Sequence, residues 1–136
     1  MIAIVDAGPL YASVDDDDED HLRSRSILQR VDLHLVVPAL VIAEVTYMVG
    51  RRLGSRVEAR FLRGLTELDI EPPSIGDWVR MAELVDQYAD FPLGGTDASV
   101  IALAERMETD LVVTLDLRHF TVVRPRHCSA FRLLPQ

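Results

Sequence analysis

Short apolar runs alternate along the chain with longer segments in which apolar residues recur every three or four positions. The runs are typical of strands buried on both faces of a parallel sheet, and the longer spacing is typical of helices. We predict strands over residues 1–5, 33–37, 69–71, 111–114 and 129–134. We predict helices over residues 9–14, 16–31, 39–53, 55–68, 74–88 and 97–108, and a short turn over 117–120.

The predicted strands and helices alternate through the whole chain. This order predicts an α/β fold, a three-layer α/β/α sandwich with a mostly parallel sheet of four to five strands. The strand over 129–134 is expected at the edge of that sheet. A length of 136 residues without an internal repeat or linker predicts a single domain over 1–136.

The composition excludes several classes of protein. The single cysteine, Cys128, rules out an internal disulfide and a zinc site built from thiolates. No run of 18 apolar residues exists, so no membrane span is expected. The first residues lack the basic and apolar regions of a signal peptide, and we therefore expect a cytoplasmic protein.

The net charge of −8 comes mostly from one run of six acidic residues, 15–20. We interpret this run as the solvated start of a helix, because carboxylates stabilise a helix N-terminus; metal binding is the alternative. All fourteen basic residues are Arg. The absence of Lys excludes a P-loop nucleotide site and Schiff-base chemistry.

Two acidic residues follow predicted strands. Asp6 comes directly after the first strand, and Asp116 lies two residues beyond Thr114, which ends the strand over 111–114. Ligands of open parallel sheets bind at the carboxyl ends of strands, so both residues are candidates for a site. The local alternatives are that Asp6 caps the next helix and that Asp116 forms a turn.

Two further acidic residues lie on predicted helices. Glu44 shares its helix face with apolar residues, and no Arg lies within four positions of it. We expect a carboxylate on a buried face, which costs several kcal/mol unless it is paired or bound to a metal. The alternative is an exposed break in the apolar face. Asp97 opens the helix over 97–108, where Thr96 and Asp97 both suit a cap.

Four carboxylates in one pocket repel one another unless cations neutralise them. A set of oxygen ligands selects hard ions such as Mg²⁺ or Mn²⁺, which keep several waters and bind phosphate. Such ions activate water and stabilise the leaving oxygen in phosphodiester hydrolysis. If the four acids converge, the sequence therefore favours a metal-dependent nuclease.

Four short segments give the chain a family resemblance: residues 4–10, 38–45, 93–98 and 114–120. In their order and spacing they resemble the PIN-domain ribonucleases, in particular the VapC-like toxins of bacterial toxin–antitoxin pairs. The resemblance implies Asp6, Glu44, Asp97 and Asp116 as the catalytic, metal-binding cluster, with Thr114 as a supporting hydroxyl. It also implies Mg²⁺ or Mn²⁺ as cofactor, an RNA substrate, an antitoxin partner and a homodimer. The acidic run over 15–20 is unusual for this family.

Two surfaces are expected to bind the RNA and the partner. A rim of Arg side chains would hold RNA phosphates, and the candidates are Arg51, Arg52 and Arg118, with Arg56, Arg60 and Arg63 nearby; solvated helix charge is the alternative. The resemblance also implies a groove between the N-terminal helices that binds an amphipathic segment of the antitoxin. Its candidate residues are Tyr11, Leu40, Met48, Phe61 and Leu65, for which plain core packing is the alternative.

Three other functions compete with a metal-dependent nuclease. A phosphoryl-transfer domain with Asp6 as nucleophile lacks a Lys, and Gly8 occupies the position where a second acid is needed. A metal-free ribonuclease needs two converging imidazoles, and no spacing brings together His21, His34, His119 and His127. A non-catalytic PIN-like scaffold that binds RNA or protein has no need of four acids.

Overall fold

The computed structural model describes residues 1–135. Five strands form one parallel sheet in the order β3-β2-β1-β4-β5. The strands are β1 Ile2–Val5, β2 His34–Pro38, β3 Asp69–Glu71, β4 Leu111–Val113 and β5 Arg132–Leu134. The helices are α1 Ala7–Val14, α2 His21–Leu28, α3 Ala39–Leu53, α4 Ser55–Gly64, η1 Leu65–Glu67, α5 Ile75–Gln87, α6 Gly95–Arg106 and α7 Leu117–Val122.

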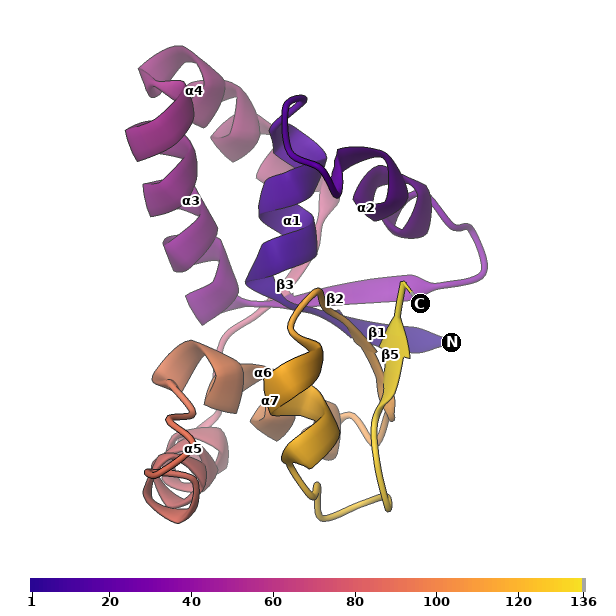
Figure 1. Cartoon of the computed structure of the whole chain (residues 1–136), viewed down its shortest axis with the longest axis vertical. Coiled ribbons are helices and arrows are strands. Elements are labelled where there is room, and N and C mark those ends of the chain that lie inside the picture. The colour runs from indigo at the N-terminus through magenta and orange to yellow at the C-terminus, as the bar shows by residue number, and fades with distance from the viewer. Residues whose placement is uncertain (136) are drawn as a thin grey trace.

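Helices cover both faces of the sheet, which confirms the predicted three-layer α/β/α fold. Figure 1 shows α1 to α4 on one side of the sheet and α5, α6 and α7 on the other. The apolar runs of β1 and β4 are buried on both faces: Ile4, Val5, Val112 and Val113 are fully inaccessible to solvent. No helix within residues 1–135 is long and apolar enough to cross a membrane.

Strong local signals set the bounds of several elements. The helix over 39–53 and the strand over 69–71 have the bounds predicted from the sequence. Ser74 caps α5 through a reciprocal pair of hydrogen bonds with Asp77, as expected for a Ser three residues before an acid. Strand β5 lies at the edge of the sheet, as predicted.

Other predicted bounds were wrong. The helix predicted over 16–31 is only His21–Leu28, because the acidic run forms turns in which Asp15 and Asp18 accept backbone N–H groups. The helix predicted over 55–68 ends at Gly64 and continues as the short η1. The turn predicted over 117–120 is the start of the helix α7.

The start of α6 also differs from the prediction. The helix begins at Gly95, two residues earlier than predicted, and its N-cap Gly94 makes no side-chain cap. Thr96 therefore lies inside the first turn and does not cap the helix. Asp97 lies one residue further in, so its carboxylate does not occupy the N-cap position either.

Candidate active site

The carboxyl ends of β1 and β4 lie side by side at the point where the strand order reverses. The two strands are paired, and the Asp6 N–H donates to the Val113 carbonyl at 2.9 Å. Ligands of open α/β sheets bind at such a point. A pocket of about 400 Å³ lies here, and its lining includes all four predicted acids, Asp6, Glu44, Asp97 and Asp116.

Thr114 connects two of the acids. Its hydroxyl is fully buried, donates to Asp6 Oδ2 at 2.8 Å and accepts the Asp116 backbone N–H at 2.9 Å. One hydroxyl thus fixes the carboxylate that follows β1 relative to the backbone that follows β4. The supporting role that the resemblance implies for Thr114 stays a prediction.

The pKa values of three acids are raised. Burial raises the pKa of Asp6 to about 6, although the hydrogen bonds from Thr114 and the Ala7 backbone act in the opposite direction. Burial also raises the pKa of Asp97, where the nearby His119 opposes the shift and the charges of Asp116 and Glu44 add to it. The pKa of Glu44 is raised by burial and by the charge of Asp6.

Glu44 lines the pocket, but its side chain is more exposed than predicted. The buried face of α3 consists of Val41, Val45 and Val49, whereas Glu44 is exposed to solvent. The prediction of a carboxylate on a buried face was wrong. Glu44 lies at the mouth of the pocket, where the side chain is open to water and still close enough to feel the charge of Asp6.

Asp116 is held by His119, a residue that the sequence did not single out for the site. Asp116 caps α7: its Oδ1 accepts the His119 backbone N–H at 3.0 Å, and its Oδ2 lies 2.7 Å from His119 Nδ1. One ligand atom each from Asp97, Asp116 and His119 lie within 4.8 Å of one another, a spacing that can hold a metal ion. The three-residue separation of Asp116 and His119 is the signal that could have identified this contact.

The Arg candidates lie outside the pocket of acids. Arg51 and Arg52 are exposed near the end of α3, and the Arg52 guanidinium lies 5.1 Å from the centre of the Tyr11 ring. They are seven and eight residues beyond Glu44, which is about 11 Å along the helix axis. Arg118 is exposed beside Asp116, with its guanidinium 5.4 Å from the centre of the Phe91 ring.

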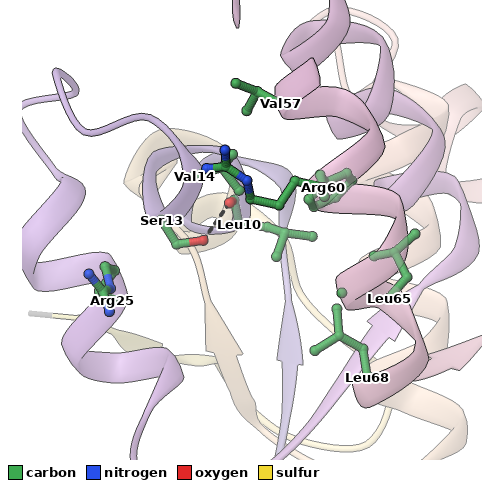
Figure 2. A pocket seen from close by; sticks show the side chains of 10 residues that line it. Leu10, Ser13, Val14, Arg25, Val57, Arg60, Leu65 and Leu68 are labelled. Atoms are coloured by element: carbon green, nitrogen blue, oxygen red, sulfur yellow. Dashed lines mark hydrogen bonds between the residues drawn. The ribbon is translucent and has the colours of Figure 1, made fainter. Parts of the chain in front are cut away.

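A second hollow lies between α1, α2 and α4, as Figure 2 shows. Leu10, Val57 and Leu65 give it apolar walls, Arg25 lies on the α2 side, and the Arg60 side chain extends from α4 across the hollow toward Val14. The predicted groove residues divide between three places. Phe61 and Leu65 line this hollow, Met48 lines the pocket of acids, and Tyr11 and Leu40 line neither. All five also pack in or against the core, which was the alternative stated.

The family model described as PIN domain matches residues 3–124 of this chain. The protein belongs to the PIN-domain family. Over 134 residues, 97% of the chain and 99% of the relative, this PIN domain is 33% identical to Ribonuclease VapC26 of Mycobacterium tuberculosis. The family that four short segments suggested from the sequence is thus confirmed.

Solved structures show the same fold. VapC20 of Mycobacterium tuberculosis, described as a toxin that cleaves the Sarcin-Ricin loop, superposes with a TM-score of 0.74 at 17% identity, covering 82% of this chain and 87% of that one. VapBC2 from Rickettsia felis, bound to a promoter DNA fragment, gives 0.71 at 16% identity, covering 99% and 100%. A toxin–antitoxin complex from Klebsiella pneumoniae gives 0.68 at 17% identity, covering 89% and 92%.

Proposed function

We propose that this PIN-domain protein is a Mg²⁺- or Mn²⁺-dependent endoribonuclease and the toxin of a toxin–antitoxin pair. The observation that supports it best is the pocket in which Asp6, Glu44, Asp97 and Asp116 converge. Within residues 1–135, no Arg forms an ion pair with any of these carboxylates. The similarity to Ribonuclease VapC26 supports RNA as the substrate.

The donor set fits a hard divalent cation. All four side chains offer carboxylate oxygens, which Mg²⁺ and Mn²⁺ prefer. Burial is the main cause of the raised pKa values of Asp6, Glu44 and Asp97, and the charges of neighbouring acids add to it. In our proposal these three residues and Asp116 hold the ion, which, when bound, lowers the pKa of a water and stabilises charge on the phosphate.

In this proposal the buried and the exposed side chains of the site have different roles. Asp6 is buried and fixed by the Thr114 hydroxyl, so it anchors the centre of the site. Glu44 is open to solvent at the mouth, where a carboxylate with a raised pKa can accept a proton from the attacking water. In our proposal the exposed Arg118 contacts a phosphate of the RNA beside the site.

Substitution of the acids tests the nuclease. Asp6→Asn and Asp97→Asn should each lower RNA cleavage in Mg²⁺ or Mn²⁺ by more than about 100-fold, because each removes a ligand at almost constant volume. Glu44→Gln and Asp116→Asn should also lose most cleavage. Glu105→Gln is the matched control, since Glu105 lies on the same helix as Asp97 but outside the pocket.

Cleavage close to wild type by Asp6→Asn or Asp97→Asn would contradict the proposed site. Activity that survives EDTA would favour a metal-free ribonuclease. A protein that does not bind Mn²⁺ in calorimetry and does not cut RNA would favour the non-catalytic scaffold.

We further propose that the hollow between α1, α2 and α4 binds an amphipathic segment of the antitoxin. Its apolar walls, with Arg25 and Arg60 alongside, suit a segment that has one apolar face and acidic residues beside it. Expression of this chain alone should stop growth, and a small protein encoded beside it should restore growth. Harmless expression of a folded, RNA-cleaving protein would contradict the toxin role and leave the nuclease intact.

A homodimer is the remaining part of the proposal. The outer face of α5 supports it, because Ile75, Trp78 and Val79 are 87%, 52% and 58% exposed and lie on one side of that helix. Sedimentation should show a dimer that Trp78→Glu weakens. A monomeric wild type at micromolar concentration would contradict this part.

A further inference from the structure

His119 touches both oxygens of Asp116. Its backbone N–H donates to Oδ1 at 3.0 Å, and its ring Nδ1 lies 2.7 Å from Oδ2. A carboxylate only accepts hydrogen bonds, so Nδ1 must carry the proton in this contact. The backbone bond caps α7, whereas the ring bond is additional and depends on the side chain alone.

The ring of His119 is held firmly on its other side. Phe91, in the loop before α6, packs edge-on against it with ring centroids 4.9 Å apart and an angle of 66° between planes. Arg118 in turn lies over the Phe91 ring. The His119 side chain is only 18% exposed, and among residues 1–135 its buried Nε2 has no hydrogen-bond partner. The Nδ1 bond is therefore the one polar contact that fixes the orientation of the ring within the described part of the chain.

The contact leaves Asp116 able to bind a cation. Each carboxylate oxygen has two lone-pair directions, so a bond from His119 to each oxygen leaves one direction on each. The Asp116 backbone is fixed independently, by its N–H bond to Thr114 Oγ1. With the backbone held by Thr114 and the carboxylate held by His119, the side chain has little freedom to turn away from Asp97.

We propose that His119 is a positioning residue, whose Nδ1–H holds the Asp116 carboxylate in the orientation that binds the divalent ion together with Asp97. This role rests on the proposed function, because it concerns the same site. Groups that orient metal ligands typically change metal affinity by 10–100-fold when they are removed. His119 thereby lets a half-buried acid at the start of α7 act as a ligand with a defined geometry.

Three substitutions of His119 separate its two ring nitrogens. His119→Asn places an amide N–H near the position of Nδ1, whereas His119→Gln places it near Nε2. His119→Phe keeps a ring against Phe91 and removes both nitrogens. All three keep the backbone N–H that caps α7, so the helix cap is a constant in the comparison.

The readouts are Mn²⁺ affinity by calorimetry and the Mn²⁺ concentration that gives half-maximal RNA cleavage. His119→Phe and His119→Gln should weaken Mn²⁺ binding by 10–100-fold and raise that concentration in proportion. His119→Asn should stay within about threefold of wild type for both. In the metal-free wild type, long-range proton–nitrogen NMR should show the proton on Nδ1.

Three other results would contradict the positioning role of His119 Nδ1, and they can be told apart. If wild type binds Mn²⁺ and cleaves RNA but His119→Phe does both equally well, His119 has no positioning role and the proposed function stands. Rescue by Gln and not by Asn would assign the action to Nε2, against the proposal. If wild type neither binds Mn²⁺ nor cleaves RNA, both the proposed function and this role of His119 are wrong.

Discussion

Two acids on the same helix, Asp97 and Glu105, have opposite surroundings. Glu105 accepts hydrogen bonds from Arg80 Nε and Nη2 at 2.7 and 3.0 Å and from the Arg126 backbone N–H at 2.8 Å. Burial acts to raise its pKa, but these contacts outweigh burial and lower it. Asp97 has no Arg partner among residues 1–135, and its pKa is raised. At Glu105 the chain supplies the positive charge of Arg80, whereas at Asp97 the effect of burial exceeds that of His119 and the pKa stays raised.

The contrast extends to the neighbours of each acid. Between α5 and α6, Asp77 also has an Arg partner, with Arg106 Nε at 2.9 Å from its Oδ2. At the carboxyl end of β1, Asp6 has the Thr114 hydroxyl and no cation among the described residues. The acids between α5 and α6 are thus paired with Arg, and the acids of the pocket have no Arg partner among the described residues, as the proposed metal site requires.

The largest effect on stability is expected at Glu105, the acid that is paired with Arg80. Glu105→Gln should lower the free energy of unfolding by about 3 kcal/mol, because it leaves the Arg80 guanidinium, only 12% exposed, with the more distant Glu83 at 3.5 Å. Urea denaturation without metal measures this. Cleavage per folded molecule should not change. A loss below about 0.5 kcal/mol, the size of a surface-pair effect, would contradict a stabilising role of the Arg80–Glu105 pair.

Metal binding at the pocket that contains Asp97 should stabilise the folded protein by a similar amount. Mn²⁺ at about 100 times its Kd should add about 2.7 kcal/mol to wild-type stability, since it binds the folded site and not the unfolded chain. Asp97→Asn should abolish this gain and leave the metal-free melting temperature unchanged or higher. Thermal melts with EDTA and with Mn²⁺ test both. A wild type that gains nothing, together with an Asp97→Ala that melts well below it, would make Asp97 a purely structural residue.

The pH dependence of stability should differ between wild type and Asp6→Asn. The pKa of Asp6 in the folded protein, about 6, lies above its ordinary value of 3.8. Its stabilising contribution is therefore complete below about pH 3.8 and is lost as the pH rises through about 6, a loss of about 2 kcal/mol between pH 4 and 7.5. Asp6→Asn has no such loss. Urea midpoints in EDTA across this range measure it, and parallel curves for the two proteins would contradict the raised pKa.

The smallest effect concerns an exposed Arg. Arg118→Ala should weaken RNA binding a few-fold and reduce the slope of log affinity against log salt by about one, because Arg118 is exposed and can contact a phosphate. The double variant Arg51→Ala/Arg52→Ala should also weaken RNA binding and reduce this slope. Titrations of a short RNA in EDTA, which prevents cleavage, provide the slopes. An unchanged slope would mean that these side chains are only solvated charges.

Local signals explain the parts of the fold that the sequence predicted correctly. Pro38 precedes α3 and Gly54 follows it, and Gly54 has a φ of 88°, which favours glycine. The apolar run of β1 predicted a central strand, and the four candidate acids could be identified from their positions after strands and on helices. The family followed from the order of four short segments.

The predicted burial of Glu44, which depended on distant packing, was wrong. The sequence placed Glu44 on a buried face because its helical neighbours are apolar, but the face that meets the sheet is centred on Val41, Val45 and Val49. The contact of His119 with Asp116 follows a local spacing, whereas the packing of Phe91 on the ring joins residues 28 positions apart. Local propensity acts over about four residues and contains no information on such contacts.

The sequence by itself determined which residues carry carboxylates and which strand or helix each one belongs to. Only the tertiary structure decided which carboxylates meet a cation of the chain. Asp97 and Glu105 lie eight residues apart on α6, and nothing local distinguishes them as acids. Arg80 reaches Glu105 from α5, while Asp6 and Asp116 reach the surroundings of Asp97 from the ends of β1 and β4. Electrostatic energy depends on separation in space and on burial, and the packing of the sheet and its helices sets both.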